Sequence, residues 1–139
     1  MRIISGTHKN RRINFSKLNT RPTTDFAKES LFNVLNNHYI LDKALVLDLF
    51  AGSGNISYEF ISRGCEKIIA IEKNIHCVNF IKQIKQQLNM SNLEIQLSNA
   101  YTYLKNTKME YDIIFADPPY NYTQDDYNNI INLVVNRNL

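Results

Sequence analysis

Short apolar runs alternate with segments of helical periodicity along most of this chain, and this alternation restricts the fold more than any other feature. Four runs have the length and composition of buried parallel strands, at 44–50, 67–72, 93–98 and 111–117. Helices are predicted between and after them, at 55–63, 74–89, 100–105 and 125–136. The pattern predicts an α/β fold with a doubly wound, mostly parallel sheet, in which ligands bind at the carboxyl ends of the strands.

The residues before the first strand predict a hairpin and one further helix. Apolar and polar residues alternate at 2–5 and 12–15, on either side of a polar stretch, which is typical of a small β-hairpin. A helix is predicted at 25–37, where Thr24 or Asp25 can cap its start. Its apolar residues along one face are expected to face the core: Phe26, Leu31, Val34 and Leu35.

Length and composition exclude several classes of protein. The chain has 139 residues, the size of one domain. It lacks the run of about 18 apolar residues that a membrane span needs, and its first residues lack the apolar core of a secretory signal. Cys65 and Cys77 are far apart and belong to no pattern with metal-ligand spacing, so we expect neither a disulfide nor a metal site. A cytoplasmic protein with free thiols is expected.

The net charge of +3 is unevenly distributed along the chain. Residues 1–24 contain six basic residues and no acidic one, whereas the remainder has ten basic and 13 acidic residues. A basic segment of this kind is a candidate contact for the phosphates of a nucleic acid, and a solubilising tail is the alternative interpretation.

Two of the four glycines lie in the sequence DLFAGSG at 48–54, between the first strand and the following helix. Gly52 and Gly54 permit a sharp turn and the close approach of a ligand, and the helix start offers free N–H groups. Glu72 ends the next strand, where an acid in this fold accepts hydrogen bonds from ribose hydroxyls. A tight turn and an exposed glutamate are the alternatives, but together the features favour a ligand that contains a nucleoside.

The acid at the start of this loop distinguishes two nucleoside cofactors. A dinucleotide site has a third small residue for helix packing, a role for which Ser57 is available. The Asp48 carboxylate, however, is poorly placed beside a pyrophosphate and suits an ammonium or sulfonium group. The sequence therefore favours S-adenosylmethionine over NAD.

The sequence Asp117-Pro118-Pro119-Tyr120 ends the fourth predicted strand. Its two prolines fix φ and leave a stiff turn with outward carbonyls. The Asp117 carboxylate and the Pro118 carbonyl are suited to accept both N–H bonds of an exocyclic amino group, which would turn its lone pair toward a methyl donor. The Tyr120 ring is suited to stack on an extruded base. An ordinary loop is the alternative interpretation.

In this order, DLFAGSG, IEKN and FADPPY resemble class I S-adenosylmethionine-dependent methyltransferases that methylate amino groups. The segments MRIISGTHKNRRI and RPTTDFAKESLFNVL resemble the start of the bacterial 16S rRNA guanine-N2 methyltransferase (RsmD-type) family, so the resemblance covers essentially the whole chain. It implies one Rossmann-like methyltransferase domain at 1–139, with a basic hairpin arm at 1–20 and a cofactor-binding and catalytic core at 21–139.

The resemblance also implies roles for individual residues. In that family the segment before the first strand closes over the methionine part of the cofactor, which points to Arg21, Pro22 and Thr23. The other implied cofactor-binding residues are Asp48, Phe50, Gly52, Gly54, Glu72, Asn99 and Ala100. The implied catalytic residues are Asp117, Pro118, Pro119 and Tyr120. RNA contacts are expected from Arg2, Lys9, Arg11 and Arg12.

Two features depart from the family's pattern. Asn99 and Ala100 stand where the family usually has an acid that binds the adenine amino group, and an Asn carbonyl can accept the same hydrogen bond without charge. Family members also continue with further strands after the last helix, where this chain stops at Leu139. We therefore expect the C-terminal strands of the fold to be missing and the fourth strand to be an exposed edge.

Together these observations predict methylation of a guanine N2 in 16S rRNA by a monomer that binds this RNA or the small ribosomal subunit. An adenine-N6 DNA methyltransferase uses the same motif but generally needs a target-recognition segment for which the chain has no room. A protein-glutamine methyltransferase would be expected to carry Asn in place of Asp117. A non-catalytic nucleic-acid-binding module that retains the fold is the alternative from a different class.

Overall fold

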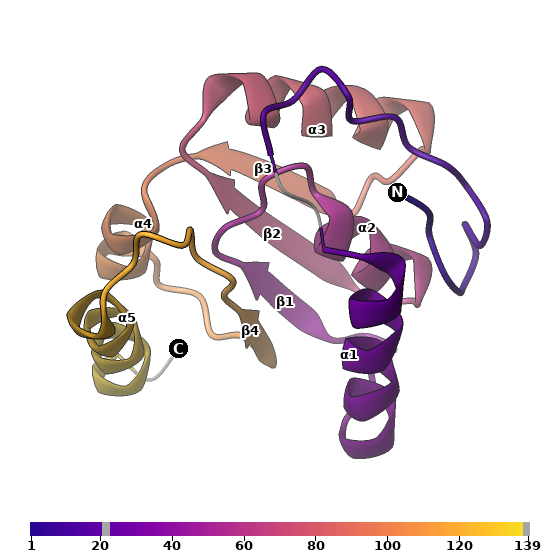
Figure 1. Cartoon of the computed structure of the whole chain (residues 1–139). Coiled ribbons are helices and arrows are strands. Elements are labelled where there is room, and N and C mark those ends of the chain that lie inside the picture. The colour runs from indigo at the N-terminus through magenta and orange to yellow at the C-terminus, as the bar shows by residue number, and fades with distance from the viewer. Residues whose placement is uncertain (21–22, 138–139) are drawn as a thin grey trace.

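A computed structural model describes residues 1–20 and 23–137, in which four parallel strands form one sheet (Figure 1). The strands are β1 (Leu45–Asp48), β2 (Lys67–Glu72), β3 (Leu93–Leu97) and β4 (Ile113–Phe115). Their order across the sheet is β3-β2-β1-β4, so the chain crosses over from β3 to the far side of β1. In such a sheet the crevice for a ligand lies beyond the carboxyl ends of the strands, where the strand order reverses.

Five helices connect and cover these strands within the described residues. They are α1 (Asp25–His38), α2 (Asn55–Ser62), α3 (Ile75–Gln87), α4 (Ala100–Asn106) and α5 (Gln124–Asn136). Residues of α1, α2 and α3 pack in the core on one face of the sheet, and those of α4 and α5 pack on the other (Figure 1). The predicted α/β class is confirmed, and every strand and helix predicted from residue 25 onward is present, with no end shifted by more than two residues.

The N-terminal arm, residues 1–20, contains a single antiparallel β-bridge in place of two regular strands. Arg2 pairs with Arg12, and the backbone N–H of Ile3 donates to the carbonyl of Arg11 over 3.0 Å. Ile3 and Ile13 are buried and attach the arm to the core. The predicted hairpin is thus present in a shortened form, because only a few residues on each side alternate between polar and apolar.

Helix α1 buries a different set of residues from the one predicted. Leu31 and Leu35 pack against the core as expected, but Phe26 and Val34 are exposed. Lys28, in contrast, has no exposed side-chain surface. The prediction was wrong for Phe26 and Val34, because the face of α1 that packs on the core includes Lys28; a lysine is buried only where its charge has partners.

Lys28 of α1 and Glu59 of α2 form a fully buried ion pair, with 3.4 Å between Nζ and Oε1. Lys28 Nζ also donates to the carbonyl of Arg2 over 2.5 Å. The Glu59 carboxylate accepts the backbone N–H groups of Ile4 and Ser5 over 2.9 and 3.1 Å. Burial lowers the pKa of Lys28, and the charge of Glu59 opposes that shift. The pair therefore holds the first residues of the arm against both helices.

The substitution Glu59→Gln is expected to lower the free energy of unfolding by about 3–5 kcal/mol, because the Lys28 ammonium then remains buried without a counter-charge. Urea denaturation at pH 7 measures this change. Glu66→Gln is the matched control: Glu66 is exposed, and its substitution is expected to change the free energy by less than about 0.5 kcal/mol. Equal effects of the two substitutions would contradict the stabilising role of the buried pair.

Candidate functional site

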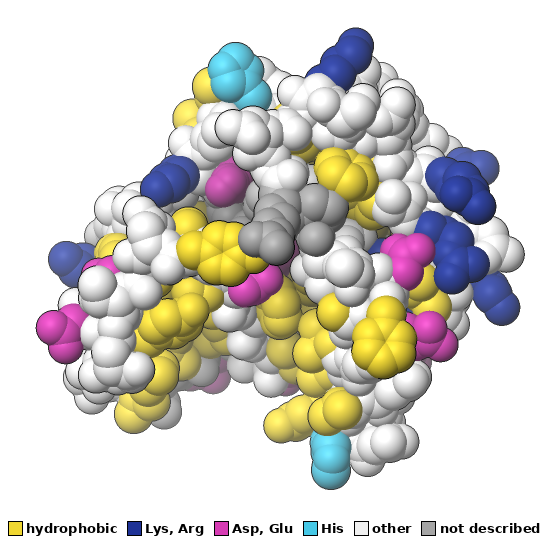
Figure 2. All heavy atoms as spheres, viewed as in Figure 1, with side chains coloured by type: hydrophobic (Ala, Val, Ile, Leu, Met, Phe, Trp, Pro, Cys, Tyr) yellow, Lys and Arg dark blue, Asp and Glu magenta, His cyan; other side chains and the backbone are white. Residues whose placement is uncertain are grey.

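A pocket of about 430 Å³ lies at the carboxyl ends of β1, β2 and β4. The loops that follow these strands line it, together with the start of α4 and the end of the arm. Acidic side chains lie in the hollowed centre of the face shown in Figure 2. The volume is within the range of about 300–1,000 Å³ that is usual for sites of small molecules.

Most residues that the sequence assigned to a cofactor or to catalysis line this one pocket. They are Thr23, Asp48, Phe50, Gly52, Glu72, Asn99, Ala100, Asp117, Pro118, Pro119 and Tyr120. Gly54 is not part of the lining and lies behind the loop. Arg21 and Pro22, also assigned to the cofactor, lie outside the described residues.

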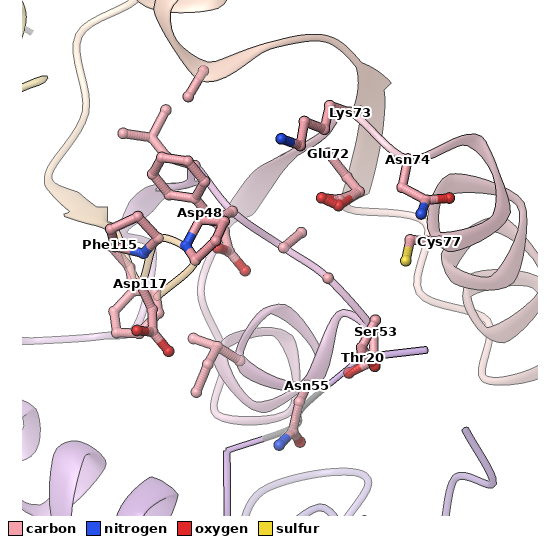
Figure 3. A pocket seen from close by; sticks show the side chains of 18 of the residues that line it. Thr20, Asp48, Ser53, Asn55, Glu72, Lys73, Asn74, Cys77, Phe115 and Asp117 are labelled. Carbon is pink, nitrogen blue, oxygen red and sulfur yellow. The ribbon is translucent and has the colours of Figure 1, made fainter. Parts of the chain in front are cut away.

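Asp48 ends β1 at the floor of the pocket and is 1% exposed. The hydroxyl of Ser57 donates to its Oδ2 over 2.8 Å, whereas Oδ1 has no hydrogen-bond partner among the described residues. Burial raises the pKa of Asp48 to about 7, and the charges of Glu72 and Asp117 add to this effect. Figure 3 shows the side chain reaching into the pocket. A buried acceptor without a partner is costly, so Oδ1 is suited to a ligand that brings a cation or an N–H donor.

The loop after β1 depends on two glycines with positive φ, 57° at Gly52 and 86° at Gly54. A Cβ at Gly54 would lie 2.5 Å from the hydroxyl oxygen of Tyr58, which donates to the carbonyl of Ser53 over 2.7 Å. Among the described residues, no atom lies within 4 Å of a Cβ placed at Gly52. Gly54 thus allows the loop to pack on α2, while Gly52 leaves open space on the pocket side.

Glu72 ends β2 and Asn99 lies shortly after the neighbouring strand β3, at the other side of the pocket. Burial raises the pKa of Glu72, whose carboxylate points toward the same space as that of Asp48 (Figure 3). Asn99 caps α4, since its Oδ1 accepts the backbone N–H of Tyr101 over 2.8 Å. The carbonyl predicted to bind an adenine amino group is therefore already engaged once, and a second lone pair remains for a ligand.

The turn 117–120 leaves β4 beside the loop after β1. Strands β4 and β1 are paired with Phe115 level with Asp48, so Asp117 begins the turn just beyond the floor of the pocket. Asp117 is exposed and Tyr120 is 81% exposed, although both line the pocket. The site therefore combines a buried acid at the floor with an acid and an aromatic ring that a large substrate can reach from solvent.

Sequence reasoning missed several residues that line the pocket, and three of them have notable surroundings. Thr20 has a buried hydroxyl with no hydrogen-bond partner in the described part of the chain. Asn55, the first residue of α2, is 4% exposed. The ring of Tyr122 packs edge-on against Phe50 with 5.3 Å between centroids. No sequence pattern around Thr20 marks it as a site residue. Asn55 and Tyr122 could have been found, because Asn55 follows the glycine loop and Tyr122 follows the proline turn.

The four basic residues assigned to RNA lie on the arm and outside the pocket lining. Lys9, Arg11 and Arg12 are exposed, while Arg2 lies 3.7 Å from the carboxylate of Asp25. In Figure 2, dark-blue side chains gather on the side of the molecule where Figure 1 places the start of the chain. The arm thus presents positive charge beside a pocket lined by acids.

Residues 1–20 and 23–137 contain no group of three or more His, Cys, Asp or Glu side chains that could hold a metal ion. Cys65 and Cys77 are buried free thiols, and burial raises the pKa of Cys65 to about 12. Across the same ranges, no helix is long and apolar enough to cross a membrane.

Comparison with known proteins gives consistent matches. The family model described as conserved hypothetical protein 95 matches residues 1–139. Ribosomal RNA small subunit methyltransferase D of Buchnera aphidicola subsp. Acyrthosiphon pisum is 40% identical over 139 residues, which cover 97% of this chain and 70% of that protein. The protein of the same name from Buchnera aphidicola subsp. Baizongia pistaciae is 39% identical over 124 residues, which cover 88% of this chain and 63% of that protein.

A solved structure agrees with these matches. The candidate methyltransferase yhhF from Escherichia coli superimposes with a TM-score of 0.85 at 30% identity, over 96% of this chain and 71% of that chain. The present chain thus spans 63% and 70% of the lengths of the two Buchnera relatives.

The buried Asp48 carboxyl is expected to make stability depend on pH. Its pKa is about 7 in the folded protein against an ordinary value of 3.8, so the folded state keeps a proton that the unfolded state has already released. The free energy of unfolding should therefore fall as the pH rises from 3.8 to about 7. At higher pH the carboxyl is ionised in both the folded and the unfolded state, so it should cause no further change.

Asp48→Asn should flatten that pH dependence and raise the free energy of unfolding at pH 8 by ~2–4 kcal/mol. Urea denaturation across the pH range measures both effects in the ligand-free protein. Asp42→Asn, at an exposed position, is the control and should leave the profile unchanged. If the free energy of unfolding of the wild-type protein instead rose between pH 5 and 7, in parallel with that of Asp48→Asn, this would contradict the raised pKa of Asp48.

Proposed function

The chain belongs to the family of conserved hypothetical protein 95, the RsmD family of methyltransferases, and on this premise we propose that it methylates the exocyclic N2 amino group of a guanine in 16S ribosomal RNA. The relatives at 39% and 40% identity are named ribosomal RNA small subunit methyltransferases. Neither the RNA nor the guanine position is given by membership alone, and both parts of the proposal rest on the chemistry of the pocket and the arm.

The pocket residues fit S-adenosylmethionine, which supplies an activated methyl group on a positively charged sulfur when bound. Asp48 offers Oδ1, which has no hydrogen-bond partner in residues 1–20 and 23–137, to the ammonium group, and this cation would favour the ionised carboxylate despite its burial. Thr20 offers a second buried hydroxyl without a partner among the described residues. Glu72 is suited to the ribose hydroxyls, and Asn99 and Ala100 to the adenine.

The observation that carries the proposal is that the turn 117–120 and Asp48 line the same pocket. Asp117 and the Pro118 carbonyl accept the two N–H bonds of an unstacked guanine, and Tyr120 stacks on its ring. The lone pair of N2 then faces the methyl carbon. The bound cofactor would supply the methyl group to N2 and leave as a neutral thioether, and Asp117 would accept the extra proton of N2 and pass it to water. Orientation supplies most of the rate enhancement, and the reaction calls for no covalent intermediate with the protein.

The arm is proposed to bind the RNA backbone. Lys9, Arg11 and Arg12 are exposed on it, and phosphates are the natural partners of such a group. Asp48, Glu72 and Asp117 would repel a phosphate, so the charge distribution favours the backbone on the arm and a neutral base in the pocket. We propose that one copy of the chain suffices for both contacts.

Binding of 16S rRNA is expected to weaken with salt in proportion to the phosphates that the arm contacts. The triple variant Lys9→Gln, Arg11→Gln, Arg12→Gln removes three of these phosphate contacts. Its slope of log K against log salt should therefore be shallower by about 2 than that of the wild-type protein. Filter binding at several salt concentrations measures the slopes. The control variant Lys105→Gln, Lys108→Gln changes exposed lysines beyond the arm and should keep the wild-type slope. An unchanged slope in the triple variant would exclude the arm as the phosphate contact.

Asp117→Ala is expected to lower kcat for methyl transfer by about 100-fold or more, because the amino group loses its acceptor. The assay follows labelled methyl from S-adenosylmethionine into 16S rRNA, naked and in small-subunit particles from cells that lack the endogenous enzyme. Asp125→Ala, at an exposed position on α5, is the control and should retain full activity.

The outcomes of this assay separate the proposals. Label on a guanine N2 that is lost in Asp117→Ala supports the proposed reaction. Label on another atom would keep the methyltransferase activity and reject the N2 position. If calorimetry shows that the cofactor binds, but no methyl group is transferred to naked 16S rRNA or to small-subunit particles, a non-catalytic nucleic-acid-binding module is favoured.

A further inference from the structure

Lys28 lies where three segments of the chain meet, and all of its polar contacts are internal. Its side chain has no exposed surface, and its Nζ contacts the Arg2 carbonyl, the Asn55 Oδ1 and the Glu59 Oε1. A lysine ammonium has three N–H donors, and these three oxygens match that number. A lysine so completely desolvated is rare, and a methionine would fill the same space without the cost of burying a charge.

One side of this contact holds the arm. Lys28 donates to the carbonyl of Arg2, and its partner Glu59 accepts the N–H groups of Ile4 and Ser5. These residues shortly precede the basic stretch at 9–12. The position of the arm relative to α2 therefore depends on the ion pair together with the hydrogen bonds of Thr7 and His8 to Ser62.

The other side of the contact reaches the pocket. Asn55 accepts from Lys28 over 2.7 Å and donates through Nδ2 to the carbonyl of Thr23 over 3.0 Å. Asn55 and Thr23 both line the pocket, and Asn55 directly follows the glycine loop (Figure 3). Both ends of the Asn55 amide are thus engaged, one by Lys28 and one by the backbone before α1.

A continuous series of hydrogen bonds therefore runs from the Arg2 carbonyl through Lys28 and Asn55 to the Thr23 carbonyl. We propose that Lys28 is a positioning residue that couples the two binding sites, so that a cofactor in the pocket strengthens the binding of RNA by the arm. A ligand packed against Asn55 and Thr23 restricts them, and through Lys28 it restricts the arm, so the arm loses less freedom when RNA binds. The same coupling must act in the reverse direction.

This inference rests on the proposed function, and its test is the affinity for in vitro transcribed 16S rRNA with and without saturating S-adenosylhomocysteine. In the wild-type protein the cofactor product is expected to lower the Kd for RNA by about fivefold or more. The double variant Lys28→Met, Glu59→Gln removes both charges together, which avoids the uncompensated charge of either single variant. In this variant the ratio of the two Kd values is expected to fall close to one.

Two further measurements separate positioning from a loss of structure. Hydrogen exchange at the Ile4 and Ser5 amides should be slowed by S-adenosylhomocysteine in the wild-type protein and not in the double variant, while urea denaturation verifies that the variant is folded. Lys105→Met, at an exposed position on α4, is the control and should retain the wild-type ratio.

The results that overturn the inference are distinct from those that overturn the proposed function. A wild-type ratio near one, or an unchanged ratio in the folded double variant, rejects the coupling while RNA and cofactor still bind. A wild-type chain that binds neither S-adenosylhomocysteine nor RNA rejects the proposed function, and the inference is then rejected with it.

Discussion

The buried ion pair between Lys28 and Glu59 is the interaction on which the arrangement of the molecule depends. Two charges removed from water are stable only when every remaining donor and acceptor has a partner, and here the partners come from the arm and from the start of α2. The pair thus joins the first residues of the arm, α1 and α2. The sheet provides the platform for the pocket, and this pair, together with the buried Ile3 and Ile13, holds the arm and its positive charge beside it.

In the pocket, by contrast, a buried acidic group lacks a compensating partner among the described residues. Asp48 is buried with one oxygen partnered by Ser57 and the other without a partner in the described chain, and burial raises its pKa. The protein groups of the site alone therefore leave a buried polar atom without a hydrogen bond, which is usual in a site that binds a ligand. Lys28 and Asp48 are comparably buried, and they differ in whether the protein itself supplies the compensating group.

The fold could be predicted because its signal is local. The run at 67–72 has four apolar residues between Lys67 and Glu72, and the predicted strand has the bounds that the structure gives to β2. The pocket could be anticipated because strand ends converge at one edge of a parallel sheet, which brings Asp48, Glu72 and Asp117 together. Lys28 could not be found in this way. A charged residue on a helix normally faces solvent, and only the three-dimensional placement of Glu59 and Asn55 makes its burial favourable.

The attachment of the arm has a consequence for synthesis on the ribosome. Ile4 and Ser5 bond to Glu59, 55 and 54 residues further along the chain, and the N–H of Thr7 bonds to the carbonyl of Ser62. The residues of the arm thus have their partners among residues made much later. The arm must remain unattached until α2 has emerged, so its docking follows the synthesis of α2, although the arm itself is translated before that helix.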